Sequence, residues 1–256
     1  TITIGKMIEV KNIEKSFDGI QILKGITTTF ETGKTNLIIG QSGSGKTVFI
    51  KSLLGVHEID SGYISFDNRI YKELNKDEKR DIRTEIGMVF QGGALYDSLT
   101  VEENIMFPLK MFKDQSNSEM LDRVNFVLKR VNLTDCNKKF PAEISGGMQK
   151  RVAIARAIVM NPKYLFCDEP NSGLDPKTAI VIDKLIHEIT KEYNITTIIN
   201  SHDMNSVIEI GEKIIFLLSG EKNWEGTNTE ILKTNVKSVK NFVYSSELLK
   251  KVKKYL

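Results

Sequence analysis

The sequence predicts an α/β fold in which helices cover a mostly parallel sheet. Short runs of apolar or β-branched residues, such as Tyr164–Cys167, Thr196–Ile199 and Lys213–Leu218, are typical of buried strands. Between the first two runs, Lys177–Glu192 carries apolar residues at helical spacing. Strands that alternate with helices in this way are the pattern of a parallel sheet.

The composition limits the class of protein. The chain has 256 residues, of which 40% are apolar and 27% charged, and this suits one large domain with an inserted subdomain. Its net charge of +3 is too small for a protein held to nucleic acid mainly by charge, so we expect no nucleic-acid partner. No apolar stretch approaches the roughly 20 residues of a membrane-spanning helix. Because no secretory leader opens the sequence either, we expect a cytoplasmic protein.

The first third of the chain is expected to be β structure. Met7–Ile13 and Gln21–Phe30 are rich in β-branched residues, and Asp18-Gly19 between them is a turn signal. Further runs of strand character are Asn36–Ile39, Tyr63–Phe66 and Gly87–Phe90.

From about residue 92 to residue 161 the pattern becomes helical, which predicts a helical insertion in the α/β domain. The apolar residues of one stretch fall on a single helical face. They are Met120, Leu121, Val124, Val127, Leu128 and Val131.

A glycine-rich segment between the strand Asn36–Ile39 and the predicted helix Thr47–Leu54 matches the GxxxxGK[ST] pattern of a phosphate-binding loop. Glycines there let backbone N–H groups surround a phosphate chain, Lys46 would reach the β- and γ-phosphates, and the Thr47 hydroxyl would bind Mg²⁺. The alternative is an ordinary glycine-rich turn. The segment consists of Gly40, Gln41, Ser42, Gly43, Ser44, Gly45, Lys46 and Thr47.

Two carboxylates follow the apolar strand Tyr164–Cys167, which is the form of a Walker B site. Asp168 would hold Mg²⁺ through water, and Glu169 would polarise the water that attacks the γ-phosphate. The alternative is a strand that ends in a solvated acidic turn.

A second anion site is predicted at the start of a helix with apolar residues at Met148, Val152, Ala155 and Val159. Ser145 is placed to cap this helix, and two glycines follow it. Taken alone, the segment is better explained as an ordinary capped core helix. The predicted site residues are Ser145, Gly146 and Gly147.

Together these segments resemble the nucleotide-binding domain of an ABC transporter over residues 7–226. The motifs follow the family's order. They are the phosphate loop, Gln91, Ser145–Met148, Asp168-Glu169, Ser172–Asp175 and His202. The resemblance implies a P-loop NTPase of ABC type, with a mostly parallel sheet, an antiparallel β subdomain, a helical subdomain at about 92–161 and a helical tail at 227–256.

The resemblance also implies ATP and Mg²⁺ as cofactors and a head-to-tail dimer that closes over ATP, so that neither subunit has a complete site. Phe17 falls where the family stacks an aromatic ring on adenine, although it could simply be a core residue. Gln91 would contact Mg²⁺ or the attacking water, and His202 would orient that water at the γ-phosphate. Asp175 would act across the dimer interface.

Two features of the sequence indicate which branch of the ABC transporter family it resembles. Met148 stands where the usual signature has Gln, and Phe90–Val101 together with the Ser-Gly-Gly-Met motif resembles the MlaF family of Mla/Mce-type lipid transporters. That resemblance implies transport of phospholipid or another hydrophobic substrate, powered from the cytoplasmic face of the inner membrane. It also implies an integral-membrane permease, an Mce-domain substrate-binding protein and in some systems a STAS-domain subunit. An importer or exporter of an amino acid, a metal complex or a lipoprotein is the alternative.

The tail beyond Gly226 leaves three interpretations open: a solvated terminal helix, a clasp on the second subunit, or a surface for anionic lipid. Each assumes an apolar face opposite a basic one. The apolar face would contain Phe242, Val243, Leu248, Leu249 and Val252, and the basic one Lys250, Lys251, Lys253 and Lys254.

Overall fold

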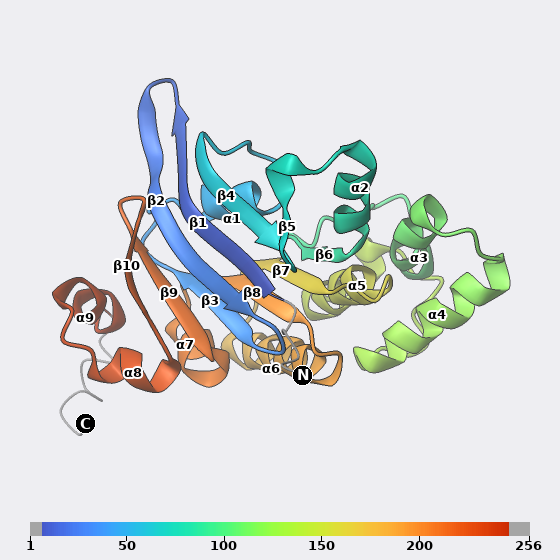
Figure 1. Ribbon diagram of the computed structural model, residues 1–256. Coiled ribbons are helices and arrows are strands. Elements are labelled where there is room, and N and C mark those ends of the chain that lie inside the picture. Colours follow the sequence, from blue (N-terminus) through green and yellow to red (C-terminus); the bar gives the residue numbers. More distant parts are fainter. Residues whose placement is uncertain (1–6, 246–256) are drawn as a thin grey trace, which may run out of the picture. The chain divides into compact units, whose positions relative to one another are not determined.

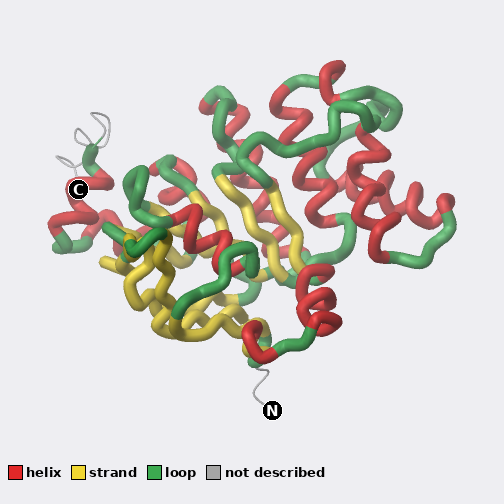
Figure 2. The backbone as a smooth tube through the Cα atoms, turned by 90° about the horizontal axis from the view of Figure 1, so that it is seen from above, coloured by secondary structure: helices red, strands yellow, loops and turns green. Residues whose placement is uncertain are grey.

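The structure, a computed structural model, describes residues 7–245. The described residues divide into two compact units, one made of residues 7–73 and 200–245 and the other of residues 74–199. We call them the strand-rich and the helix-rich unit, and Figure 2 shows their strands in yellow and their helices in red. The predictions for Leu248, Leu249, Val252 and the four terminal lysines fall outside the described residues.

An antiparallel sheet in the order β2-β1-β4-β5 forms one layer of the strand-rich unit (Figure 1). The predicted turn joins its first two strands, with Asp18 and Gly19 both at positive φ, as a two-residue hairpin requires. Both strands are longer than predicted, because polar residues continue the pairing as far as Phe17 opposite Ile20. The strands are β1 (Met7–Phe17), β2 (Ile20–Glu31), β4 (Ser61–Phe66) and β5 (Arg69–Ile70).

Three further strands of this unit run in the order β10-β9-β3. The central β9 (Lys213–Leu218) pairs in parallel with β3 (Thr35–Ile39) and antiparallel with β10 (Glu221–Gly226). All five residues of β3 are buried, and its apolar residues Leu37, Ile38 and Ile39 are those expected inside a sheet. The helices of the unit are α1 (Lys46–Leu53), α7 (Met204–Ile210), α8 (Asn228–Lys233) and α9 (Lys237–Val243).

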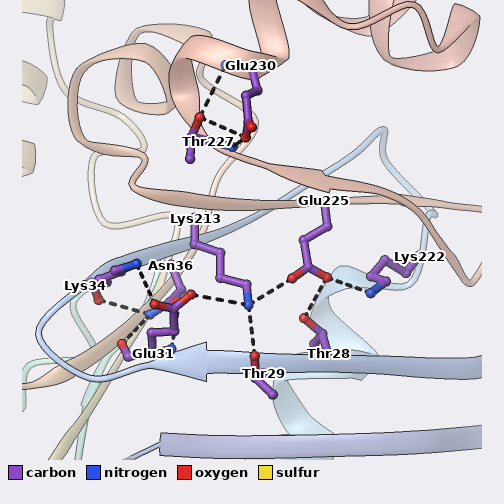
Figure 3. Close-up of polar contacts among 10 residues, drawn as sticks. All are labelled: Thr28, Thr29, Glu31, Lys34, Asn36, Lys213, Lys222, Glu225, Thr227 and Glu230. Carbon is purple, nitrogen blue, oxygen red and sulfur yellow. Dashed lines mark hydrogen bonds and ion pairs between the residues drawn. The ribbon is translucent and has the colours of Figure 1, made fainter. Parts of the chain in front are cut away.

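A charged network joins β2, β9 and β10 (Figure 3). Lys213 is 9% exposed, and its ammonium lies 2.9 Å from a carboxylate oxygen of Glu225 and donates a hydrogen bond of 3.0 Å to the Thr29 hydroxyl. Lys222 donates to the other Glu225 oxygen at 2.6 Å. The carboxylate of Glu225 therefore compensates a charge that would otherwise be costly to bury.

The helix-rich unit contains strands in the order β8-β7-β6, of which β7 and β6 pair in parallel. These strands are β6 (Ile86–Val89), β7 (Tyr164–Asp168) and β8 (Thr196–Asn200). Its helices are α2 (Lys76–Thr84), α3 (Val101–Phe112), α4 (Asn117–Arg130), α5 (Gly146–Ile158) and α6 (Pro176–Glu192).

The helical periodicity read from the sequence places the right residues in the core of this unit. On α4, Met120, Val124, Val127 and Leu128 are buried, whereas Leu121 lies at the margin. Ser116 and Glu119 form a capping box at the start of α4, which fixes where the helix begins. Within residues 7–245, no helix combines the length and the apolar character needed to cross a membrane.

Candidate functional site

The phosphate loop leads from β3 into α1 in a backbone conformation that requires glycine. Gly40 has a φ of 153°, and a Cβ atom on it would lie 2.4 Å from the carbonyl oxygen of Leu217. Gly45 has a φ of 99° and directly precedes α1, with its carbonyl accepting the N–H of Phe49 at 2.8 Å. The loop therefore opens the helix N-terminus, where backbone N–H groups and the helix dipole favour an anion.

Lys46 and Ser44 supply polar groups to this loop. The Lys46 ammonium is nearly buried and donates to the carbonyl oxygens of Gly40 and Gln41 at 2.8 and 3.0 Å. The Ser44 hydroxyl is buried and makes no hydrogen bond among the described residues. Because a buried hydroxyl without a partner is costly, it fits a loop built to bind a polar ligand. The residues present therefore suit a nucleotide phosphate.

His202 lies in the same unit as the phosphate loop. The N–H of the preceding Ser201 donates to the carbonyl oxygen of Ile38 at 3.2 Å, two residues before the loop begins. This hydrogen bond places the segment after β8 next to the strand that carries the phosphate loop. His202 is exposed there, so its side chain is accessible to a ligand.

Phe17 ends β1 with 39% of its surface exposed, so it is not a core residue. Its ring meets the His57 ring edge-on at a centroid distance of 5.1 Å, and the Lys15 ammonium lies 5.2 Å from its centroid. Asp60 holds this corner by an ion pair of 2.8 Å to Lys15 and by accepting the N–H of Ser16 at 2.6 Å. An exposed ring on such a support is suited to stacking.

Gln91 and Glu169, which are 78 positions apart, meet in the helix-rich unit. The side-chain amide of Gln91 donates to a carboxylate oxygen of Glu169 at 2.9 Å. Glu169 has a φ of 45°, and a non-glycine residue is usually kept in such a costly conformation at functional positions. Asp168 precedes it as the half-buried last residue of β7. The structure thus brings together the carboxylate and the amide that the sequence singles out.

The signature residues start α5 as predicted. The Ser145 hydroxyl accepts the N–H of Met148 at 3.3 Å, and Gly146 is exposed beside it. Asp175 caps α6 by accepting the N–H of Thr178 at 3.0 Å, and the hydrogen bonds from Thr178 hold the pKa of Asp175 below its usual value. Ser145, Gly146, Gly147 and Asp175 line one hollow of about 720 Å³. Glycines and a helix N-terminus suit this hollow to an anion.

Gln149 does not take over the position that Met148 fills. Its side-chain amide donates to the carbonyl oxygen of Pro141 at 2.9 Å and so holds the segment before the helix. Two other α5 residues, which sequence reasoning missed, contact the loop after β6: Lys150 and Arg156. Their partners are backbone carbonyls far away in the sequence, so no local pattern could have indicated them.

A second hollow, of about 460 Å³, lies beside the same loop. Its walls are mostly apolar and include the side chains of Phe90, Tyr96 and Phe112, each more than 40% exposed. Arg156 supplies a positive charge to the lining. Apolar side chains that remain this exposed on a concave surface are typical of an interaction site. We call this hollow the aromatic groove.

Comparison with known proteins identifies the family. Residues 23–172, more than half of the chain, match the family model described as ABC transporter. The chain is 35% identical to the methionine import ATP-binding protein MetN of Clostridioides difficile, and the match covers 95% of this chain and 75% of that protein. It is 40% identical to the probable ribonucleotide transport ATP-binding protein mkl of Mycobacterium leprae, over 79% of this chain and 58% of that protein.

Solved structures agree in fold. The dimeric structure of MJ0796, a bacterial ABC transporter cassette, has a TM-score of 0.78 at 34% identity, covering 86% of this chain and 98% of that one. The same cassette is known in a dimeric post-hydrolysis state bound to ADP and Pi. For cbiO1 from Clostridium perfringens the TM-score is 0.84 at 29% identity, over 97% of this chain and 99% of that one. The predicted fold class is thereby confirmed, and the chain belongs to the ABC transporter family as one of its ATPase domains.

Proposed function

We propose that this chain is the ATP-hydrolysing subunit of an ABC transporter of the bacterial cell envelope, placed on the cytoplasmic face of the inner membrane. Residues 7–226 form the nucleotide-binding domain, with a helical subdomain at about 92–161. The observation that carries the proposal is the hydrogen bond between Gln91 and Glu169. This hydrogen bond holds the Glu169 carboxylate, which is expected to activate water, next to the Gln91 amide, which is expected to respond to transport.

The chemistry assigns a role to each site residue. Gly40–Thr47 bind the phosphates of ATP, and Phe17 stacks on the adenine. Thr47, Gln91 and Asp168 would hold Mg²⁺, which would neutralise charge on the phosphates.

Hydrolysis then needs one activated water. His202 orients this water. As the water oxygen forms a bond to the γ-phosphorus, Glu169 accepts a proton from the water. The bond from the γ-phosphorus to the bridging oxygen breaks, which gives ADP and phosphate.

A second copy of the chain completes the site in this proposal. Ser145, Gly146 and Gly147 of one copy approach the γ-phosphate held by the other, and Asp175 acts across the interface. The hollow beside these residues and the open N-terminus of α5 support that assignment. An integral-membrane permease docks a cytoplasmic segment in the aromatic groove. The exposed rings of Phe90, Tyr96 and Phe112 in this groove support the contact.

For the cargo we propose phospholipid or another hydrophobic substrate, delivered with an Mce-domain protein and in some systems a STAS-domain subunit. The support is the similarity of Phe90–Val101 and of the Ser-Gly-Gly-Met motif to lipid-transport ATPases. Import of an amino acid is the second candidate, because the methionine import relative matches 95% of this chain.

Changing Glu169→Gln tests the hydrolytic role. The amide keeps the shape of the side chain but cannot take a proton from water, so we expect the turnover number to fall about 10²- to 10³-fold. ATP binding should persist, and an ATP-bound dimer should accumulate in gel filtration with light scattering. Full turnover in this variant would refute the assigned role.

Two further variants complete this experiment. Glu188→Gln, at a glutamate on α6 whose side chain is 63% exposed, should leave turnover unchanged. Lys46→Ala should instead weaken the binding of a fluorescent ATP analogue, because it removes the buried ammonium at the phosphate loop.

The cargo is tested by isolating the chain from its native membranes with its partners. Recovery of an Mce-domain protein would support lipid transport, whereas recovery of a soluble amino-acid receptor would favour the second candidate.

A further inference from the structure

Side chains of helix α5 hold the loop that follows β6 by binding the carbonyl groups of the loop. The Lys150 ammonium donates to the carbonyl oxygen of Gln91. The Arg156 guanidinium donates to the carbonyl oxygens of Gly93 and Ala94 at 2.6 and 2.8 Å. Two cations from one helix therefore bind the carbonyl groups of three of the four residues 91–94 in this loop. We call Lys150 and Arg156 the α5 brace.

Burial makes these contacts strong. Lys150 is 7% exposed, and this burial lowers the pKa of its ammonium, an effect that the negative charge of Glu169 opposes. Burial lowers the pKa of Arg156 in the same way. Away from bulk water, charge-assisted hydrogen bonds to carbonyl groups are worth more than their neutral counterparts.

The loop itself has a conformation that needs such support. Gly93 has a φ of 76° and Ala94 a φ of 47°, so two successive residues are left-handed. A residue with a Cβ atom, such as Ala94, stays in this region only where its surroundings hold it there. Arg156 binds the carbonyl groups of both residues. The guanidinium therefore selects the backbone conformation of the loop.

The brace lies between three features of the proposed function. The signature residue Ser145 caps the start of α5, Arg156 lines the aromatic groove, and Gln91 in the loop donates to Glu169. A displacement of α5 or of the groove wall would therefore move the Gln91 backbone. The amide that holds the Glu169 carboxylate would move with it.

We propose that Lys150 and Arg156 are positioning residues that transmit movement of α5 and occupancy of the aromatic groove to Glu169 through Gln91. This inference rests on the proposed roles of Gln91 and Glu169. It adds a physical link between the surface where a partner docks and the carboxylate that activates water. It also separates turnover from ATP binding, because the two brace residues act on the loop after β6, which is not part of the proposed phosphate-binding segment Gly40–Thr47.

Removing either cation tests the link in the full chain. We expect Lys150→Met and Arg156→Met each to lower the ATP turnover number by about tenfold or more. The dissociation constant of a fluorescent ATP analogue should stay within about twofold of the wild-type value, because the phosphate loop is intact. Lys150→Arg, which keeps a cationic donor, should retain most of the turnover.

Arg123→Met is the matched control. Arg123 is a half-buried arginine on α4 that also donates to carbonyl groups of the α5 region, those of Val159 at 2.9 Å and Ile158 at 3.1 Å. It binds carbonyl groups at the end of that helix and not those of residues 91–94 in the loop after β6. We expect it to lower the melting temperature as much as the brace variants do while turnover stays near wild type. Equal losses of turnover in all three variants would reduce the brace to a structural role and overturn the proposal.

A double variant separates this inference from the function on which it rests. If the brace acts through the Gln91 side chain, Gln91→Ala combined with Lys150→Met should lose no more turnover than Gln91→Ala alone. Multiplicative losses would contradict the link. If Glu169→Gln kept full turnover, the assigned carboxylate would be wrong. If Glu169→Gln were inactive and the brace variants were normal, only the brace would be wrong.

Discussion

Glu225 is the residue whose ionisation matters most for the network around Lys213 (Figure 3). Burial opposes its charge, but hydrogen bonds from Lys222 and Lys213 outweigh this effect, so the pKa of Glu225 is lowered from 4.5. The unfolded chain therefore takes up this proton at a higher pH than the folded chain. The resulting stabilisation is complete above pH 4.5 and is lost as the pH falls through the lower, folded-state value.

Changing Glu225→Gln should therefore lower the free energy of unfolding only at pH values at which the wild-type carboxylate is charged. At pH 7 we expect the free energy of unfolding to fall by about 1–3 kcal/mol, because the buried Lys213 loses its carboxylate. At a pH below the lowered folded-state pKa of Glu225, the difference from wild type should nearly disappear. Urea unfolding at both pH values measures it.

The comparison with Glu221→Gln isolates the network, since Glu221 is an exposed residue at the start of the same strand. It should change stability little at either pH. A loss for Glu225→Gln that is independent of pH would mean that packing rather than charge is responsible.

Some site residues are predictable from sequence because their chemistry is local. Gly40, Lys46 and Thr47 lie within one short motif whose backbone needs glycine, and the loop has the predicted form. The contact of Gln91 with Glu169 spans 78 positions, and a resemblance rather than a local pattern suggested those two residues. No sequence pattern indicates the contacts of Lys150 and Arg156. Every residue has a backbone carbonyl group, so the residue type of the partner does not reveal such a contact.

At the scale of elements, the approach of β6 to α5 depends on a missing side chain. A Cβ atom on Gly87 would lie 2.3 Å from the carbonyl oxygen of Ala157. Changing Gly87→Ala should force the strand and the helix apart and cost about 2–3 kcal/mol, as expected for an overpacked core. Chemical denaturation followed by circular dichroism would measure the loss.

Gly92→Ala is the matched control for that substitution, because a Cβ atom on Gly92 would meet nothing within 4 Å. Its free energy of unfolding should stay within about 0.5 kcal/mol of wild type. If the two variants were equally stable, the strand and helix would not be in the close contact described.

Elements with an apolar pattern are the ones that the sequence predicts. Lys213–Leu218 is a strand with the predicted bounds, since all but its last residue are buried. The strand β10 escaped prediction because its residues are largely polar and it pairs only through β9 among the strands described. The polar helix α2 escaped too, although Asn75 and Glu78 form a capping box that could have indicated its start.

At the scale of the whole molecule, the proposed head-to-tail dimer predicts complementation between two inactive variants. Lys46→Ala damages the phosphate loop, and Gly146→Asp places a negative charge where the signature would meet phosphate. The nearest atom to a Cβ on Gly146 is 3.9 Å away, so the second variant should fold. Mixed in equal amounts, the two variants should recover about a quarter of wild-type turnover, because half of the dimers carry one complete site.

Each variant alone should stay inactive at the same total concentration, which is the control for residual activity. Turnover that stays at the level of the separate variants, while mixed dimers are detected by a tag on one partner, would contradict the shared site.

The order of motifs along the chain was enough to predict the family, because each motif constrains its own short backbone segment. The cargo and the partners could not be predicted in the same way. They depend on surfaces such as the aromatic groove, whose residues Phe90, Tyr96 and Phe112 come together only in the folded chain.

The buried lysines have a practical consequence. Lys213 and Lys46 lie in the strand-rich unit and Lys150 in the helix-rich unit, each less than 10% exposed, whereas the side chain of Lys138 is 82% exposed. An amine-acetylating reagent would modify Lys138 at once and would reach the other three only as their surroundings open. Mass spectrometry of the modified peptides would then time the opening of each unit separately in a single sample.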